Sequence, residues 1–486
     1  MRSRHVLAAL ILSLAALSGC LPEARIAWSP DGTHALVRAG DGLYLSDGDG
    51  KLSPRIAEDV AAVAWLPDSR RFIAACNQPA ATWDELVPHL SEERKAAAEG
   101  EAELLRREVL ACKGDWGKLR FRTPSADILA ALMCLRDRHG DELGPVVGDR
   151  WSGLKALRHG VYTLRLFEVA DGKVGEGRLL LESLEPPAEI RAAPTGKAFA
   201  YAAPPYPALG AEAALVLFVV PLGAPESATR VASRASIFFD WTADGRSLVY
   251  ASTDEPDPGA LSRYATLGSP PESLVYRRAR MPEFFRQRDL RLGSLVRKAV
   301  VDGEGTVLAE PARTKLADVA FFDSMPVACL PDGRVLFAAR EVRLPAATDG
   351  VADDLALFAV EPSDPRTVRK LALPEARADA QRRLDLMQLS PDRTRLLIPD
   401  SKGAIDLLDL ATGKVTEAAK DLPAVPAKTI PAWRSNRELC FIAGTADGED
   451  AKKRPEVVLW SAEGTRCLSK DWPEPAAKGF LAAGGG

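Results

Sequence analysis

The chain has 486 residues, of which 47% are hydrophobic and 27% are charged, and its formal net charge at pH 7 is −4. This balance argues against a general nucleic-acid-binding protein, for which a basic domain is expected. The length allows a large core, and 7 cysteines are too few for a disulfide-rich scaffold.

Residues 1–19 predict an export signal. A positively charged start precedes an apolar stretch, residues 6–17, that is too short to span a bilayer. The stretch ends in Leu17-Ser18-Gly19-Cys20, which resembles the lipobox of bacterial lipoproteins. That resemblance implies lipidation of the Cys20 thiol and durable membrane anchoring. A non-aspartate at Leu21 favours the outer membrane if the source is Gram-negative. The alternative is an ordinary secretory signal with a chance cysteine.

A five-residue turn returns through the rest of the chain. In the first copy, Trp28-Ser29-Pro30-Asp31-Gly32, the proline presets φ, the aspartate can bond nearby backbone, and the glycine can adopt a left-handed conformation. Each copy lies between two apolar runs, which predicts strand–turn–strand repeats. The later copies begin at Trp65, Ala192, Trp241, Cys329, Leu389 and, in eroded form, Trp433.

These turns resemble the WD40-like repeats of TolB-type propellers, in which such a turn follows the first strand of each blade. The same repeat forms the propellers of some oligopeptidases. The resemblance implies an all-β fold, a seven-bladed β-propeller over residues 20–472, with six blades possible because the seventh turn is eroded. A lone four-stranded blade cannot bury both faces, so blades must stack in a closed ring. The resemblance identifies the fold, but it says little about function, because one fold can host many functions.

The second and third turns are 127 positions apart (192 minus 65), whereas a blade needs about 40 to 45 residues. The surplus is rich in Glu, Ala, Leu and Arg, and Thr82-Trp83-Asp84-Glu85 has the form of a capping box. We therefore expect a helical insertion in blade two, over residues 81–158. Cys112 and Cys134 lie at helical ends of this insertion and are the first pair to test for a disulfide, which an oxidising compartment would permit.

The fourth and fifth turns are 88 positions apart (329 minus 241), which predicts a second insertion over residues 253–289. It is basic, with interleaved aromatic residues, and arginine forks suit phosphate and carboxylate groups. Anionic lipid head groups, lipopolysaccharide or an acidic protein surface could bind there, although a solvated loop is the ordinary explanation. The candidate partner-binding residues are Arg277, Arg278, Arg280, Arg286 and Arg288. The tail, residues 473–486, is predicted to be disordered.

No catalytic, cofactor-binding or metal-binding residues are predicted. There is no nucleophile-elbow or phosphate-loop motif, and the 5 histidines are scattered. Asp47-Gly48-Asp49-Gly50 is interpreted as a hairpin turn rather than a calcium site. The sequence therefore favours a lipid-anchored propeller that binds or scaffolds an unidentified protein of the bacterial cell envelope, facing the periplasm or the cell surface. The alternative is a lyase- or lactonase-like propeller enzyme with its site in the central channel.

Overall fold

The structure is a computed structural model, and its description covers most of the chain. The described residues are 24–39, 42–112, 128–148, 151–204, 215–252, 291–309, 312–321, 325–342, 351–361, 364–373, 382–400, 404–419, 430–443 and 456–473.

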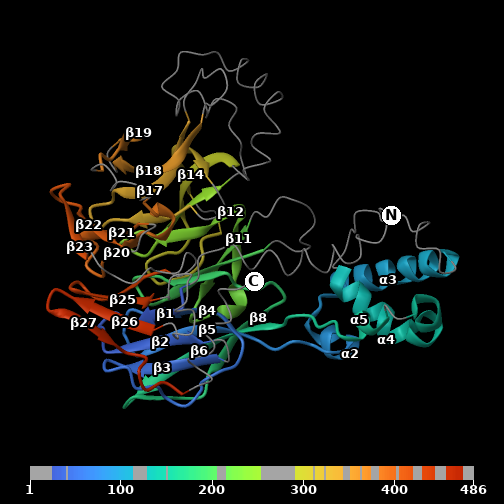
Figure 1. Ribbon diagram of the computed structural model, residues 1–486. Helices are drawn as coiled ribbons and strands as arrows, with labels where there is room; N and C mark the ends of the chain where they lie inside the picture. The colour runs from blue at the N-terminus through green and yellow to red at the C-terminus, as the bar shows by residue number, and fades with distance from the viewer. Residues whose placement is uncertain are drawn as a thin grey trace, which may run out of the picture.

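The first two sheets are antiparallel (Figure 1). The first contains β1 (Ile26–Trp28), β2 (His34–Ala39) and β3 (Gly42–Asp47), and isolated bridges extend it beyond β3. The second contains β4 (Val60–Trp65), β5 (Arg71–Asn77), β6 (Tyr162–Ala170), β7 (Lys173–Val174) and β8 (Arg178–Ser183). Both β7 and β8 pair with β6.

The third sheet has seven strands, because the long strand β12 pairs with one group of strands through its first part and with a second group through its last part. Its strands are β9 (Glu189–Ala192), β10 (Ala198–Ala203), β11 (Leu215–Pro221), β12 (Thr229–Trp241), β13 (Ser247–Ser252), β14 (Arg291–Ala299) and β15 (Arg313–Phe321). The N-terminal part of β12 pairs with β11, and its C-terminal part pairs with β13 after a register shift between Ala235 and Phe239. β12 therefore ends one four-stranded group and begins the next.

The last three sheets have four strands each, in sequence order. One contains β16 (Val327–Cys329), β17 (Val335–Val342), β18 (Val351–Glu361) and β19 (Asp364–Lys370). The next contains β20 (Gln388–Leu389), β21 (Arg395–Pro399), β22 (Ile405–Asp409) and β23 (Val415–Ala419). The last contains β24 (Ala432–Ser435), β25 (Glu438–Ala443), β26 (Glu456–Ser461) and β27 (Gly464–Cys467).

These sheets form a closed ring. Along the chain, β1 adjoins β4, β4 adjoins β9, β9 adjoins β12 and β12 adjoins β16. Shared apolar clusters join the last three sheets, and β24 returns to lie beside β1. Figure 1 shows the C-terminal strands β25–β27 next to β1–β3. Ile26 and Trp28 pack there against Cys440 and Leu459 in one buried cluster. An all-β ring of antiparallel sheets with its first strands adjoining one another is a β-propeller.

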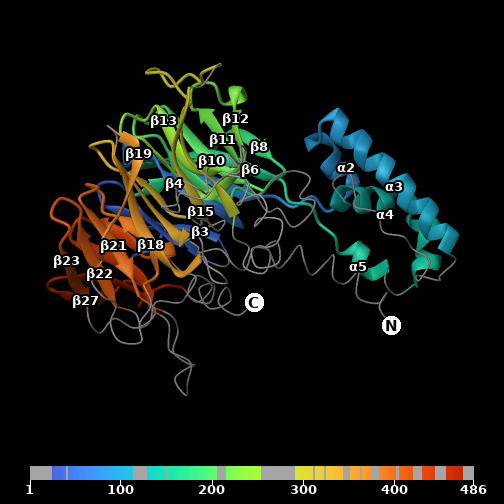
Figure 2. The ribbon, with the colours of Figure 1, turned by 90° about the horizontal axis from the view of Figure 1, so that it is seen from above.

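The described residues between β5 and β6 form four α-helices. They are α2 (Trp83–Leu86), α3 (Glu92–Cys112), α4 (Ile128–Val147) and α5 (Trp151–Lys155), and they lie together to one side of the sheets in both views (Figures 1 and 2). Short 3₁₀ helices are η2 (Val87–His89), η5 (Pro225–Ser227) and η6 (Leu384–Leu386). The α-helices pack in one hydrophobic cluster, built around Trp83, Met133 and Trp151, which also includes Val161 and Leu184 beside the sheet. We call residues 81–158 the helical unit.

The start of α2 shows the Thr82 half of the predicted capping box. The Thr82 hydroxyl accepts a hydrogen bond from the Glu85 N–H at 3.2 Å, which satisfies an N–H group that a helix start leaves without a partner. The Glu85 carboxylate accepts the N–H of Ala81, one residue before the cap, at 2.6 Å.

Candidate functional site

The repeated turns share one backbone geometry. The fifth residue has a positive φ in six copies, at Gly32, Ser69, Gly196, Gly245, Gly333 and Arg393. The seventh copy differs, because Ser435 pairs with Glu438 across a tight hairpin. The erosion seen in the seventh sequence copy therefore corresponds to a different turn at the same place in the sheet.

Neighbouring turns touch one another around one end of the ring. The Asp31 N–H donates to the Ser69 hydroxyl at 3.0 Å, and the Asp392 N–H donates to the Asn436 side-chain oxygen at 3.1 Å. Arg434 Nε donates to the Gly32 carbonyl at 3.1 Å, which joins the last turn to the first. The turns therefore occupy equivalent positions around this end of the propeller.

A buried carboxylate, Asp240, lies at this end of the ring. It is the second-to-last residue of β12 and is 5% exposed. Its carboxylate accepts the Trp241 N–H at 2.9 Å and the Cys329 N–H at 2.8 Å. Arg393 adds two bonds, from Nη1 at 2.9 Å and from Nη2 at 3.4 Å. A buried charge needs such partners because it has lost its water.

Two arginines from different sheets converge on Asp240. Arg393 lies in the turn after β20, and its Nη1 also donates to the Cys329 carbonyl. Arg191, on β9, places Nη1 3.7 Å from the Asp240 carboxylate and donates from Nε to Glu189 at 2.9 Å. Burial acts to lower the pKa of Arg191, but Glu189 and Asp240 outweigh it and the net shift is upward, so the guanidinium stays charged.

The thiol beside this cluster is not a nucleophile. Cys329 is 2% exposed, and burial, followed by the charge of Asp240, raises its pKa well above the ordinary value. A protonated, enclosed thiol is unreactive, because the thiolate is the reactive form. The chemistry that the cluster offers is charge-assisted hydrogen bonding from arginine. We call Glu189, Arg191, Asp240 and Arg393 the ring-end cluster.

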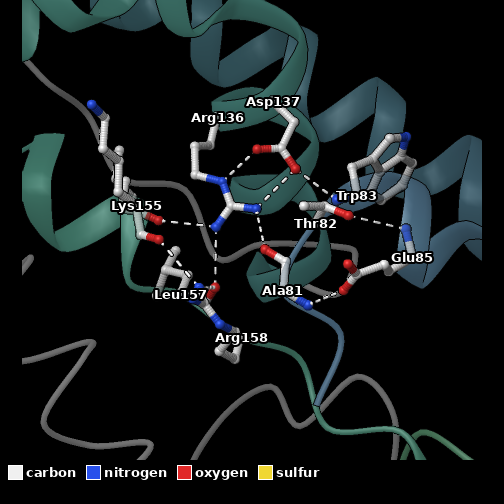
Figure 3. Close-up of polar contacts among 10 residues, drawn as sticks. Ala81, Thr82, Trp83, Glu85, Arg136, Asp137, Lys155, Leu157 and Arg158 are labelled. Atoms are coloured by element: carbon white, nitrogen blue, oxygen red, sulfur yellow. Dashed lines mark hydrogen bonds and ion pairs between the residues drawn. The ribbon is translucent and has the colours of Figure 1, made fainter. Parts of the chain in front are cut away.

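A second polar network holds the base of the helical unit together (Figure 3). Arg136, on α4, is 8% exposed and donates to the carbonyls of Ala81 at 2.6 Å, Leu157 at 3.1 Å and Leu154 at 3.3 Å. It also pairs with Asp137, whose carboxylate accepts the Trp83 N–H at 2.6 Å. The Arg136 side chain therefore connects both the start of the helical unit, at Ala81, and its end, at Leu154 and Leu157, to α4.

A hydrogen bond and an ion pair join the helical unit to the sheet region. His89 Nδ1 lies 2.8 Å from Glu182 of β8, and Arg94 Nη2 lies 2.5 Å from Glu185. A main-chain bridge pairs Ala80 with His159, the residues that flank the helical unit on either side. We call this paired segment the stalk of the unit. The unit therefore contacts the propeller near its stalk and beside β8.

Most of the site residues predicted from sequence lie outside the described residues. These are Cys20 and the arginines Arg277, Arg278, Arg280, Arg286 and Arg288. The two cysteines proposed for a disulfide, Cys112 and Cys134, are both described, and both are buried free thiols. The suggested bridge is therefore absent. Cys134 instead packs in the apolar core of the helical unit with Met133 and Leu135.

The described residues contain no group of three His, Cys, Asp or Glu side chains that could hold a metal ion. At the predicted hairpin, the Asp47 carboxylate accepts the Asp49 and Lys51 N–H groups, at 3.0 and 2.8 Å. This carboxylate is thus engaged in the turn itself. No helix in the described ranges is long and apolar enough to cross a membrane.

Sequence reasoning did not single out the ring-end cluster. Two signals for it were present. An aspartate interrupts the apolar run Ile237-Phe238-Phe239-Asp240-Trp241 just before a turn, and Arg393 replaces the glycine of the frame in the sixth copy. Neither signal identifies its partner, because the two residues are 153 positions apart.

No family model and no curated protein matches this chain. Similar solved structures are β-propellers. The propeller domain of Myceliophteria_thermophila Cps50 (Swd1) is 10% identical, with a TM-score of 0.41, over 91% of this chain and 97% of that one. A putative TolB from Agrobacterium tumefaciens is 13% identical, with a TM-score of 0.34, over 61% of this chain and 84% of that one.

Enzymes also occur among the similar structures. An oligogalacturonate lyase in complex with manganese is 12% identical, with a TM-score of 0.37, over 65% of this chain and 74% of that one. Two peptidases match as well. At these identities and scores the likenesses carry no argument about function, so the sequence-based prediction that the chain is not an enzyme gains no support from them.

Proposed function

We propose that this chain is an exported lipoprotein, anchored through Cys20, whose seven-bladed propeller acts as a protein-binding or scaffold module of the bacterial cell envelope. In this proposal the propeller faces the periplasm or the cell surface, and the helical unit is an insertion in blade two.

Seven blades are favoured over six by the turns and by the shape of β12. Each of the seven turns follows the first strand of a four-stranded group, if the seven-stranded sheet is divided at the register shift in β12. The first sheet gains its fourth edge from bridges at Ala57 and Leu52. A six-bladed ring would leave one of these turns without a blade.

The observation that carries the scaffold proposal is the helical unit. Its helices pack in one apolar cluster, its base is closed by Arg136, and it lies to one side of the sheets (Figure 2). A propeller does not need such a unit to close its ring. Segments added to a rigid scaffold are frequent sites of binding, and we assign partner recognition to this one.

Removal of the helical unit tests this role. Ala80 and His159 are paired across the stalk, so residues 81–158 can be replaced by a two-residue Asn-Gly hairpin. We expect a folded, monomeric propeller that no longer crosslinks to its envelope partner in cells. A control variant shortens the turn at Asp171-Gly172 instead and leaves the unit intact. A deletion variant that still crosslinks to the same partner would overturn the proposal.

The anchor is tested separately by replacing Cys20 with alanine. We expect the chain to move from the membrane fraction to the soluble fraction and to lose the diacylglyceryl mass at its N-terminus. Cys467→Ala is the matched control, because Cys467 is a partly exposed thiol on the last strand. Membrane attachment that survives Cys20→Ala would show that another feature holds the chain there.

The basic insertion, residues 253–289, is proposed as a second surface for an anionic partner. Charge reversal at Arg278, Arg280 and Arg288 should weaken cosedimentation with vesicles that contain anionic lipid. The control reverses three exposed arginines elsewhere, Arg107, Arg158 and Arg466. Equal cosedimentation of the two triple variants would remove the lipid-binding proposal.

An enzyme with its site in the channel is the rival proposal, and the ring-end cluster is the observation that favours it. Its weakness is that both carboxylates are paired with arginine, which leaves no free base in the cluster. The test measures turnover of lactones and of uronate oligosaccharides by the full chain and by Asp240→Asn. Turnover that depends on Asp240 would favour the enzyme, and its absence would favour the scaffold.

A further inference from the structure

Arg393 occupies a backbone position that favours glycine. Its φ is +58°, and the equivalent residues in the other turns are four glycines, with φ between +66° and +88°, and Ser69, with φ of +58°. A side chain in this region strains the backbone, and such strain gathers at functional sites. The arginine side chain does not stay in its turn, because it reaches Asp240 on β12 and the carbonyl of Cys329 on β16.

Both arginines of the ring-end cluster keep donors that no residue in the described ranges uses. Arg393 bonds through its two terminal nitrogens, so its Nε remains open. Arg191 hydrogen-bonds through Nε only, while its Nη1 makes a 3.7 Å ion pair with Asp240 and its guanidinium lies over the Phe239 ring, so its Nη2 remains open. The two side chains are 27% and 29% exposed. Their open donors are therefore within reach of a solute.

Asp240 holds the two guanidinium groups close together. Arg191 Nη1 lies 3.7 Å from Asp240 Oδ1, and Arg393 Nη2 lies 3.4 Å from the same oxygen. Side chains fixed in this way lose little further freedom when a ligand binds, which favours binding. The planar fork of arginine matches the two oxygens of a carboxylate.

The charges of the site indicate what kind of anion it accepts. Arg191 and Arg393 are balanced by Glu189 and Asp240, so the four charges of the ring-end cluster cancel before a ligand binds. A monoanion then adds less uncompensated charge to this partly desolvated site than a dianion does.

We propose that Arg191 and Arg393 form a binding site for an organic carboxylate at the turn end of the propeller. The site is independent of the scaffold proposal, because it uses neither the helical unit nor the anchor. The ligand is a small carboxylic acid, or the carboxylate of a larger molecule that enters the ring from this end.

Acetate is the probe, with inorganic phosphate as the competing anion, at constant ionic strength set with sodium chloride. We expect saturable acetate binding to the full chain by saturation-transfer NMR, with a matching rise in Tm, since a ligand that binds only the folded state stabilises it. Arg191→Gln leaves the Arg393–Asp240 pair in place and should weaken acetate binding about 10-fold, the loss expected for one charge-assisted bond.

Arg393→Gly should weaken acetate binding at least as much, because glycine suits the turn and the change removes both the ligand-binding guanidinium and its pairing with Asp240. The matched control is Ser69→Gly, which makes the same backbone change in a turn without an arginine and should bind as the unaltered chain does. Equal acetate binding by all four proteins, or no saturable binding, would overturn the site. Tighter binding of phosphate than of acetate would overturn its assignment to carboxylates.

Discussion

Trp241 donates its indole N–H to the main-chain carbonyl of Arg191, 3.0 Å away on the first strand of the preceding repeat. The same bond recurs around the ring. Trp65 donates to the Ala27 carbonyl at 2.8 Å, and Trp433 donates to the Gln388 carbonyl at 3.3 Å. In these three copies the tryptophan that opens the turn therefore joins its own repeat to the previous one, whereas the buried indole nitrogen of Trp28, in the first copy, makes no hydrogen bond with the described residues.

Trp241→Phe should lower the free energy of unfolding by about 2 kcal/mol, because it removes one hydrogen bond, leaves the Arg191 carbonyl without that donor and opens a small cavity. Urea unfolding measures the loss. Trp460→Phe is the control, since Trp460 is only partly buried and its indole bonds to no residue within the described ranges. Similar losses of unfolding free energy in the two variants would mean that the smaller side chain, and not the lost indole hydrogen bond, accounts for the destabilisation.

Stability should depend on acid pH through the turn aspartates. Burial acts to raise the pKa of Asp31, Asp244 and Asp392, but hydrogen bonds from the hydroxyl two residues before and from the N–H two residues after outweigh it, so the net pKa of each lies below its ordinary value. A lowered pKa contributes stability above the unfolded pKa, near 3.9, and this stability is lost as the pH falls through the folded values.

The free energy of unfolding should therefore be nearly flat from about pH 7 to 5 and should fall below about pH 4. The triple Asp→Asn variant at Asp31, Asp244 and Asp392 should be less stable at neutral pH and should show a shallower decline in acid. A control variant replaces Asp84, Asp141 and Asp471, which are exposed. A decline in acid that is equally steep in the turn variant would assign the pH dependence to other groups.

The repeated turn was enough to predict the ring, because the residues that determine each turn and its two strands lie within each copy. Proline, aspartate and a left-handed residue set the corner, and the apolar runs on both sides set the strands. The start of α2 was equally readable, since the spacing of Thr82 and Glu85 marks it. These features depend on residues a few positions apart.

The ring-end cluster could not be predicted in this way. Arg393 meets Asp240 only because the ring brings the turn after β20 close to the end of β12. Two repeats merge into one sheet through β12 because of a register shift between Ala235 and Phe239, and no local sequence pattern predicts this shift. Whether Cys112 and Cys134 form a disulfide was open from the sequence for the same reason, since helical ends do not reveal which side chains meet in a core, and the structure has both as free thiols.

Arg136→Met should loosen the base of the helical unit without disturbing the propeller. The guanidinium serves three carbonyls and Asp137, and removing it leaves these buried acceptors without their donor. We expect a loss of about 3 kcal/mol in the local stability of the unit. Hydrogen exchange should speed up in α2, α4 and α5, while β16–β18 stay protected.

Arg138→Met is the matched control for this change. Arg138 lies two residues further along α4, pairs with Glu99 at 2.8 Å and is 47% exposed. An exposed pair of this kind contributes at most about 1 kcal/mol. If Arg136→Met accelerated exchange throughout the sheets, the helical unit and the propeller would form one cooperative unit and not two.

The thiols should differ in reactivity according to their burial. Burial raises the pKa of Cys76 and of Cys134 to about 11 and that of Cys440 to about 12, and each side chain is buried. At pH 8 only about one in a thousand of the Cys76 and Cys134 thiols and about one in ten thousand of the Cys440 thiols is ionised, and the thiolate is the form that reacts. Cys467, which is only partly buried, should therefore be alkylated first.

Peptide mass spectrometry after brief iodoacetamide treatment of the native chain measures this order, and the urea-unfolded chain, in which all six thiols from Cys76 onward should react, is the control. Under oxidising conditions without denaturant, Cys112 and Cys134 should remain reduced, because both are enclosed as free thiols in the described structure. Alkylation of Cys134 as fast as Cys467 would show that the core of the helical unit opens readily in solution. That result would contradict the packing of Cys134 against Met133 and Leu135, on which the stability of α4 depends.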